Sequence, residues 1–430
     1  MTHQSLAPDP ALNAARAVDG ERLWQRLMEM ASIGAIPGGG VCRQALTPED
    51  IVARERLIGW ATQRGYQIAV DPIANLFIRR PGTDPDAPPV LVGSHMDSQP
   101  QGGRFDGIYG VLAALAALAA LDAAGVRTRH PVELVAWTNE EGGRFAPGAM
   151  GSMTFAGQCR LEDCLDVTDS AGVRFGDVLR ETLNATPDAG RRPLGFPVAG
   201  YLEAHIEQGP RLEAENKTIG IVTGVQGARW FQVTVSGETG HAGTVPRRLR
   251  RDALQAVLDM IQALNGLMYD PSDTVRFTVG RLTVSPNSPN AIPERVRFSI
   301  DFRHPDARLL AAKGDAVETV VRGAAGDCRV EIQETFHHAP CEFHPGVVAA
   351  LESATRRLNL PFLRLPSGAF HDALFLNDRC PTGMVFVPCE KGISHDVREN
   401  ATPEDLCAGS RVLTATLATL ADKPPEHEET

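Results

Sequence analysis

Cysteine is scarce in this chain: there are eight in 430 residues, and no two of them form a C-x-x-C pair. This excludes a disulfide-stapled scaffold and predicts reduced thiols in a cytoplasmic protein. Positive charge is also in deficit, with 42 Lys and Arg against 53 Asp and Glu and a formal net charge of -11. That sign argues against a protein dedicated to binding nucleic-acid phosphates, so nucleic acid is not expected as a partner.

Long apolar runs and common catalytic motifs are also missing. The longest apolar stretch, Ile108 to Ala120, is followed closely by Asp122 and is too short for the roughly 20 residues of a membrane span. It predicts a buried helix, and no membrane partner is expected. The N-terminal segment lacks the basic start and apolar core of an export signal. The sequence has no G-x-x-x-x-G-K-[ST] motif, no G-x-G-x-x-G, no G-x-S-x-G and no H-E-x-x-H. Phosphate binding and serine-hydrolase chemistry therefore lose their main support.

The composition is that of a globular protein with a large buried core. Hydrophobic residues make up 43% and charged residues 22%, close to globular averages. A length of 430 residues exceeds what one core usually serves, so more than one domain is expected.

The first part of the chain has an α/β pattern. Thr47 followed by Pro48 predicts the start of a helix that runs to Gly65. Strands are predicted at 66–70, 76–78, 90–93 and 132–137, with the buried helix at about 107–124 between the last two. Polar residues follow two of these strands, so the βαβ pattern predicts a site at the carboxyl edge of a sheet.

The pattern changes between residues 225 and 338. Strand, helix, two strands, helix and strand follow one another there, the β-α-β-β-α-β order of a ferredoxin-like unit. The α/β pattern then resumes with a strand at 384–387 and a closing helix at 403–421. We therefore expect a first domain built from 1–224 and 339–430, with the second domain, 225–338, inserted into it.

Histidine and acidic residues gather at strand ends and in glycine-rich turns. They are His95, Asp97, Asp106, Glu140, Glu141, His205, Glu207, His395 and Asp396. Each has an ordinary structural explanation: a satisfied histidine, a helix cap at Asp106, or solvated loop acids at 140 and 141. Together they favour a metal site, because adjacent carboxylates after an apolar strand repel each other unless a cation lies beside them. Imidazole and carboxylate suit Zn²⁺ and its first-row neighbours.

Six segments carry a resemblance to a known family. They are GSHMDS at 93–98, GGRFDGIYGV at 102–111, TNEEGGRFAP at 138–147, HIEQGP at 205–210, GHAGTVP at 240–246 and GISH at 392–395. The chain resembles the metal-dependent amidases of the M20 peptidase superfamily, and within it the hydantoinase/carbamoylase branch. That branch contains N-carbamoyl-L-amino-acid hydrolases, β-ureidopropionases and allantoate amidohydrolases.

The resemblance implies a mixed-sheet catalytic domain with two divalent metal ions, usually zinc and sometimes manganese, cobalt or nickel. It assigns His95 and His205 to one ion, Glu141 and His395 to the other, and Asp106 to both. Asp97 would fix the His95 imidazole by accepting its free N–H. Glu140 would be the general base that takes a proton from water and delivers it to the departing amine.

The inserted domain would supply substrate contacts, close over the site and build a homodimer. His241 resembles an oxyanion-stabilising histidine and Arg303 a residue that grips the substrate carboxylate. Asn290, Gln208, Ser367 and Gly368 resemble further substrate contacts. From the residues alone, His241 could be a loop histidine, Arg303 a solvated sheet arginine and Asn290 a plain turn residue.

The resemblance implies hydrolysis of a small N-carbamoyl (ureido) amino acid to the amino acid, carbon dioxide and ammonia. Allantoate or another ureido acid is the first alternative, and a dipeptidase or aminoacylase of the superfamily is the second. A metal-free binding protein of the same fold is a hypothesis of another class. It is disfavoured because every expected ligand position and the base Glu140 are occupied.

Overall fold

A computed structural model describes residues 9–422 of the chain. The chain separates into two compact units: Met1–Gly224 with Phe343–Thr430, and Val225–Glu342 between them. The second unit thus runs on to Glu342, beyond the expected boundary at 338.

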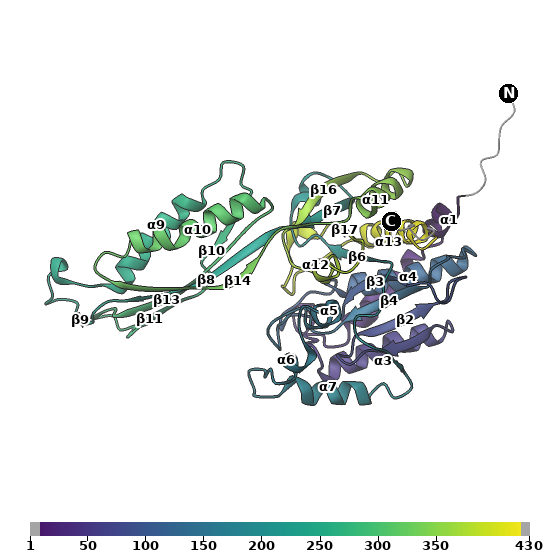
Figure 1. Cartoon of the computed structure of the whole chain (residues 1–430), viewed down its shortest axis with the longest axis horizontal. Helices are drawn as coiled ribbons and strands as arrows, with labels where there is room; N and C mark the ends of the chain where they lie inside the picture. Colours follow the sequence, from purple (N-terminus) through teal and green to yellow (C-terminus); the bar gives the residue numbers. More distant parts are fainter. Residues whose placement is uncertain (1–8, 423–430) are drawn as a thin grey trace, which may run out of the picture. The chain divides into compact units, whose positions relative to one another are not determined.

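A large mixed sheet forms the centre of the first unit (Figure 1). Its strands run in the order β7-β17-β6-β3-β4-β2-β1-β5, with β16 beside β7. The pairs β17 to β6, β6 to β3 and β3 to β4 are parallel, whereas β2 pairs antiparallel with both β4 and β1. This mixed sheet confirms the predicted α/β fold. The strand bounds are β1 Gln67–Val70, β2 Leu76–Arg80, β3 Val90–His95, β4 Val132–Trp137, β5 Gly190–Arg191, β6 Gly200–Ile206, β7 Ile219–Val225, β16 Phe362–Ser367 and β17 Thr382–Val387.

The helix predicted to start at Thr47 begins where its cap predicts. Thr47 accepts a hydrogen bond from the Asp50 amide and caps α3, whose regular helical residues run to Thr62. Gly65, the predicted end, has a φ of +76° and closes the helix, with hydrogen bonds from the Gly65 amide to the Thr62 carbonyl and from the Tyr66 amide to the Ala61 carbonyl. The helix bounds are α1 Pro10–Arg16, α2 Gly20–Ala31, α3 Pro48–Thr62, α4 Ile108–Ala123, α5 Met150–Ala156, α6 Leu161–Leu165, α7 Phe175–Asn184, α8 Arg211–Ala214, α11 Pro345–Arg357, α12 Asp372–Leu376, η2 Glu390–Gly392 and α13 Pro403–Leu420.

The Ala-rich helix α4 is buried along most of its length, as its sequence predicts. It packs against β3 and β6 of the sheet and against α13. Small alanine side chains allow this close approach to both neighbours. Within residues 9–422, no helix combines the length and apolar character that crossing a membrane requires.

The second unit has one antiparallel sheet in the order β10-β13-β8-β14, with β11 also paired to β13. Helices α9 and α10 lie together beside this sheet (Figure 1), and the unit's buried core comes from these helices and the strands. The predicted strand 275–284 is two strands, β10 and β11, because the chain leaves the ladder around Gly280. The bounds are β8 Gly227–Ser236, β9 Gly240–His241, η1 Arg247–Leu249, α9 Ala253–Met268, β10 Arg276–Thr278, β11 Leu282–Ser285, β12 Ala291–Ile292, β13 Arg295–His304, α10 Ala307–Gly323, β14 Arg329–His338 and β15 Cys341–Glu342.

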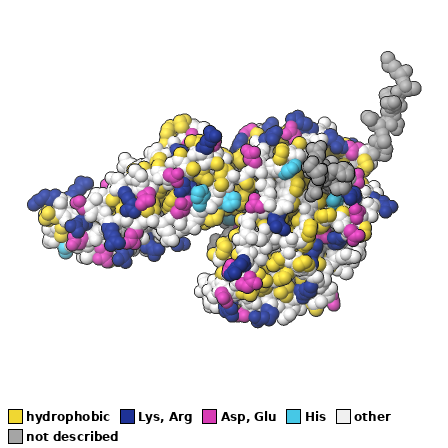
Figure 2. Space-filling view, in the orientation of Figure 1, with side chains coloured by type: hydrophobic (Ala, Val, Ile, Leu, Met, Phe, Trp, Pro, Cys, Tyr) yellow, Lys and Arg dark blue, Asp and Glu magenta, His cyan; other side chains and the backbone are white. Residues whose placement is uncertain are grey.

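Charged side chains of both signs are scattered over the visible face of the molecule (Figure 2). On the face drawn in Figure 2, Lys and Arg are interspersed with Asp and Glu on each unit. This agrees with the modest net negative charge of the sequence.

Candidate active site

The carboxyl ends of neighbouring parallel strands bring the predicted residues together. His95 is the last residue of β3, His205 lies at the end of β6, and Glu140 and Glu141 follow β4. Because β6, β3 and β4 are adjacent and parallel, their ends meet at one edge of the sheet. His395 follows β17, the next parallel strand, and reaches the same edge.

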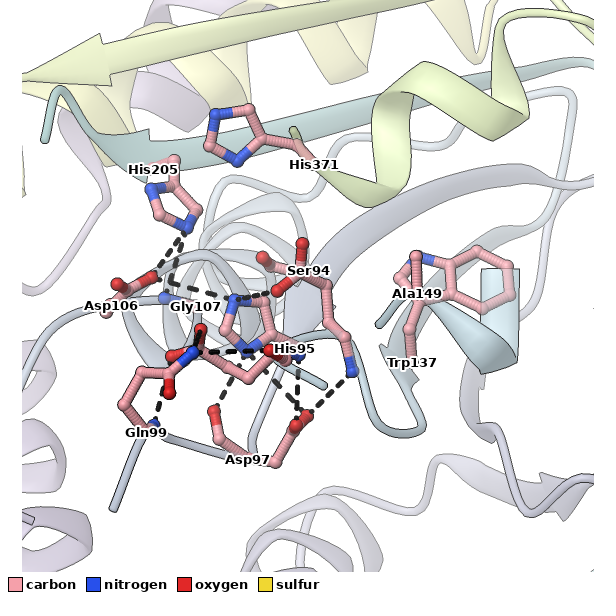
Figure 3. A network of polar contacts seen from close by, with 12 residues as sticks. Ser94, His95, Asp97, Gln99, Asp106, Gly107, Trp137, Ala149, His205 and His371 are labelled. Atoms are coloured by element: carbon pink, nitrogen blue, oxygen red, sulfur yellow. Dashed lines mark hydrogen bonds and ion pairs between the residues drawn. The ribbon is translucent and has the colours of Figure 1, made fainter. Parts of the chain in front are cut away.

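Asp106 stands between two groups of ligand-type side chains. Its Oδ1 lies 3.1 Å from His205 Nε2 and 3.6 Å from His95 Nε2. Its Oδ2 lies 3.2 Å from His395 Nε2, which in turn lies 3.3 Å from Glu141 Oε2. Each group of three could hold one ion, and Asp106 belongs to both. Figure 3 shows the first group, with Asp106 facing His95 and His205.

These separations fit bound metal. Bonds of about 2.0–2.2 Å at tetrahedral angles place neighbouring ligand atoms about 3.3–3.6 Å apart. The four nitrogen-to-oxygen distances within the two groups span 3.1–3.6 Å. The donor set of imidazole and carboxylate also suits zinc and its neighbours. The residues present therefore fit a divalent metal ion at either group.

Space around the first group depends on Gly107, which precedes α4. Its φ is +64°, and a Cβ there would lie 2.2 Å from His95 Cε1. Any larger residue would both strain the backbone and displace the imidazole. Glycine at this position is therefore a requirement of the His95 geometry.

The histidines are oriented by main-chain carbonyls. His95 Nδ1 lies 2.9 Å from the Asp97 carbonyl oxygen, and His205 Nδ1 lies 2.9 Å from the Ile206 carbonyl oxygen. A proton on each Nδ1 satisfies these contacts and leaves Nε2 with its lone pair toward Asp106.

The Asp97 carboxylate has a different task from the one predicted. It lies 3.8 Å from His95 Nδ1, too far for a hydrogen bond, whereas the carbonyl of the same residue makes that contact. The carboxylate instead accepts hydrogen bonds from the main-chain amides of Glu140 and Glu141, both at 3.2 Å. Asp97 thus holds the turn that carries the predicted base and a predicted ligand.

Glu140 belongs to neither ligand group. Its Oε2 lies 3.5 Å from His95 Nε2, and its side chain is 11% exposed. Burial, reinforced by the nearby acids Asp372 and Glu141, raises the Glu140 pKa well above its usual range, although His95 opposes this. A carboxyl group beside the ligands but outside them is suited to proton transfer.

The site buries more acid than base, and the pKa values reflect this. Burial and the nearby Asp106 raise the pKa of Glu141 to about 7. The hydrogen bond to Asp106 raises the pKa of His395 to about 9. For His95, burial lowers the pKa, but Glu140 and Asp106 outweigh it and raise the pKa well above its usual value. An excess of buried carboxylates is relieved by positive charge, which divalent ions would supply.

Gln208, predicted as a substrate contact, lies within the second group. Its Nε2 donates to Asp106 Oδ2 at 2.9 Å and to Ser394 Oγ at 3.2 Å. Its Oε1 is buried and accepts no hydrogen bond from residues 9–422. A buried amide oxygen without a donor is an unmet requirement that a ligand N–H could satisfy.

Ser367 and Gly368 lie where β16 ends. The Ser367 hydroxyl is buried and lies 2.9 Å from His371 Nε2, while Gly368 is exposed. The His371 ring packs on His205, with ring centroids 4.6 Å apart. Ser367 therefore contacts the site through His371.

Three predicted residues belong to the second unit. His241 in β9 is exposed, and its strand pairs with β12, next to Asn290. The Asn290 main-chain carbonyl accepts a hydrogen bond from the Ala242 amide at 3.0 Å, so Asn290, just before β12, lies beside the end of β9. Arg303 in β13 makes a two-point ion pair with Asp301, at 3.1 and 2.9 Å. Their roles toward a substrate stay predictions.

Sequence reasoning missed three side chains that contact predicted ligands or their neighbours. Gln99 donates to Glu141 Oε2 at 2.8 Å, His371 packs on His205, and Glu399 binds the Asp106 amide. Glu203 is a further buried acid that sequence reasoning missed, and its oxygens accept hydrogen bonds from Ser94, Tyr201 and the Ala373 amide. An acid in an apolar strand was the available signal for Glu203, whereas nothing local marks Glu399.

Comparisons with known proteins agree with this site. Residues 91–419 match the Peptidase family M20/M25/M40. The N-carbamoyl-L-amino-acid amidohydrolase of Rhizobium meliloti is 38% identical over 403 residues, covering 93% of this chain and 95% of that protein. The allantoate amidohydrolase of Escherichia coli K12 is 32% identical, covering 91% and 96%.

A solved structure extends the comparison to the fold. An amidase of the hydantoinase/carbamoylase family from Burkholderia multivorans superimposes with a TM-score of 0.89 at 46% identity. The match covers 95% of this chain and 99% of that one. The chain belongs to the Peptidase family M20/M25/M40, within its hydantoinase/carbamoylase branch.

Proposed function

We propose that the protein is a metal-dependent amidohydrolase of N-carbamoyl amino acids, working with two divalent ions. The observation that carries this is Asp106, whose two carboxylate oxygens each face a separate group of ligands. The reaction consumes one water and cleaves the linear ureido group, releasing the amino acid, carbon dioxide and ammonia. The relative from Rhizobium meliloti, whose name states this activity, supports the assignment.

His95 and His205 would hold one ion, Glu141 and His395 the other, and Asp106 would bridge them. Zinc is the ion we favour, and the same donors accept manganese, cobalt or nickel. When bound, such ions lower the pKa of water and polarise the carbonyl of the scissile bond. Gln99 orients Glu141 through the 2.8 Å hydrogen bond to its Oε2.

Glu140 is the proposed general base. It stands beside His95, outside both ligand groups, on a turn anchored by Asp97. Positive charge beside a buried carboxyl group favours its ionised form, the form that accepts a proton from water. The protonated acid can then donate to the departing nitrogen, so one residue serves both halves of the reaction.

Substrate recognition would come from both units. The unpaired Gln208 Oε1 can accept an N–H of the ureido group, which carries such donors on both nitrogens. Arg303 would bind the substrate carboxylate, exchanging its pairing with Asp301, and His241 would donate to the developing oxyanion. Further contacts to the substrate would come from Asn290, Ser367 and Gly368.

We also propose that the first unit is the catalytic domain and that the second unit closes over it and forms a homodimer. Dimerisation is tested by light scattering at micromolar concentration. A mass twice the chain mass of 46.2 kDa is expected, and a mass near 46.2 kDa would rule out the dimer.

A second substrate class is kept because the Escherichia coli relative is named an allantoate amidohydrolase. The lower identity to that protein, 32% against 38%, places the ureido amino acids first. The third candidate, a dipeptidase or aminoacylase, would use the same metal ligands but hydrolyse a different amide bond.

The test is ammonia release from a panel of N-carbamoyl-L-amino acids, N-carbamoyl-β-alanine and allantoate, with dipeptide cleavage measured in parallel. Chelated protein and protein reloaded with zinc, manganese or cobalt are compared. We expect metal-dependent turnover of an N-carbamoyl amino acid, and Glu140→Gln should lower kcat by about 10²–10⁴-fold while retaining metal. Turnover confined to dipeptides would refute the proposed substrate, and full activity of Glu140→Gln would refute the proposed base.

A further inference from the structure

Glu399 is a buried acid that the proposed chemistry does not use. Its side chain is 1% exposed, and it lies in the loop between His395 and α13. Its Oε1 accepts hydrogen bonds from two main-chain amides, Phe105 at 2.9 Å and Asp106 at 3.1 Å. One carboxylate oxygen therefore fixes the backbone at the residue that carries the bridging carboxylate.

The other oxygen reaches the second metal-ligand loop. Glu399 Oε2 accepts a hydrogen bond from Ser394 Oγ at 2.9 Å, and Ser394 immediately precedes His395. The same hydroxyl lies 3.0 Å from Asp106 Oδ2. Because a hydroxyl has one proton, Ser394 donates it to either Glu399 or Asp106, and a carboxylate oxygen that also faces an ion keeps a second lone pair for it.

The loop at 103–106 packs closely against the Glu399 carboxylate. A Cβ at Gly103 would lie 2.1 Å from the Glu399 Cδ, so the 103–106 loop lies directly against the carboxylate. Arg104 donates to Asn400 Oδ1 at 3.1 Å and joins the same two loops a second time. Two loops almost three hundred residues apart in sequence are thereby tied together at the site.

We propose that Glu399 is the positioning residue that couples Asp106 to the His395 loop and so holds the two ligand groups in register. This rests on the proposed two-metal function of the site. Residues that orient metal ligands typically change metal affinity or activity by about 10–100-fold when removed. A residue that only stabilised the fold would lower the unfolding temperature and leave the metal affinity of the folded protein unchanged.

Three substitutions separate these possibilities. Glu399→Ala removes all three hydrogen bonds. Glu399→Asp keeps the charge but withdraws both oxygens by one methylene. Glu399→Gln keeps a carbonyl oxygen for the two amides and offers an N–H to Ser394 Oγ, so it is the conservative rescue. Glu404→Gln, the same change at an exposed position of α13, is the matched control.

The primary readout is zinc affinity of the chelated proteins by competition with a chromophoric chelator, which needs no turnover. We expect zinc binding about 10–100-fold weaker in Glu399→Ala and clearly weaker in Glu399→Asp. Glu399→Gln should remain within a few-fold of wild type, and the control should be unchanged. At saturating zinc, kcat of Glu399→Ala should fall while KM changes little.

Wild-type zinc affinity and kcat in folded Glu399→Ala would overturn the proposal. If that variant does not fold, Glu399→Asp decides: binding as tight as wild type refutes the positioning role, and weaker binding with rescue in Glu399→Gln supports it. A wild-type protein inactive on ureido acids would overturn the proposed function alone, because zinc affinity still tests Glu399.

Discussion

Asp97→Asn tests whether the Asp97 carboxylate acts through the turn at Glu140 or through His95. The side chain is 4% exposed and accepts one amide hydrogen bond on each oxygen, from Glu140 and from Glu141. Asparagine keeps one acceptor and places an N–H₂ group opposite the other amide, where two donors would meet. The contact to His95 is unaffected because it uses the main-chain carbonyl.

The magnitude follows from the hydrogen bonds lost. A hydrogen bond to a charged group contributes about 1.5–3 kcal/mol. At about 1.4 kcal/mol for each factor of ten, loss of one such bond corresponds to about 10–100-fold if it is fully expressed in the transition state. The same range is typical for groups that orient metal ligands. We expect Asp97→Asn to lower kcat by this factor at saturating metal.

A double-mutant cycle with Glu140→Gln provides the assay. Ammonia release is measured for wild type, both single variants and the double variant, each fully loaded with zinc. If Asp97 acts through Glu140, the double variant should be only a few-fold slower than Glu140→Gln, because a misplaced base that is already absent has no further effect. Asp84→Asn, which removes a surface carboxylate paired with Arg129, controls for the charge change.

Full additivity would refute this reasoning. It would mean that Asp97 acts independently of Glu140, as expected if its carboxylate supported His95. An unchanged kcat in Asp97→Asn would equally contradict the assigned hydrogen bonds.

Three further predictions concern stability and metal binding. Arg54→Met should destabilise the protein by about 3–5 kcal/mol because it breaks the buried ion pair with Asp50. Arg56→Met removes an exposed ion pair with Glu29 and should change the free energy of unfolding by less than about 1 kcal/mol. Equal effects of the two substitutions in denaturant unfolding would contradict the burial of the Arg54 pair. Burial raises the pKa of Asp71 to about 7 from 3.8, so the folded state holds its proton more tightly and stability falls as pH rises through about 4–7, by up to about 1.4 kcal/mol per unit. Asp71→Asn should remove that slope, seen as a smaller difference in unfolding temperature between pH 5 and pH 8, and an unchanged difference would argue against the raised pKa. Gly107→Ala should weaken zinc binding, measured by chelator competition, because its Cβ would overlap His95; wild-type affinity would show that the imidazole can move without loss.

Much of this fold could be predicted because its elements have local signals. Hydrophobic periodicity and turn residues predict the Ala-rich helix α4 and the strands before and after it. They also predict the β-α-β-β-α-β order of the second unit. The convergence of His95 with Glu140 also follows, since parallel neighbouring strands end at one edge. One error fell where local preference is weak, because the strand predicted at 275–284 divides around Gly280.

The parts of the site that could not be predicted depend on contacts between distant segments. A sequence names Asp97 but not which of its oxygens meets His95. Gln99 and Glu399 have no local pattern, because each acts by reaching a ligand on another loop. Residue types at strand ends therefore predict the ligands, while the groups that orient those ligands require the three-dimensional structure.

Backbone conformation shows how the fold supports this chemistry. Asn139, Gln208 and His395, each within or next to the site, have φ between +54° and +56°, in the left-handed region. Such conformations in non-glycine residues cost of order 1–3 kcal/mol and persist only where surrounding structure imposes them. Asn139 is held by hydrogen bonds from its Nδ2 to the carbonyls of Phe145 and Pro147. The strain and the buried carboxylates are both offset by the sheet and the α4 core, so substitutions that relax the site should stabilise the metal-free protein and weaken its binding of metal.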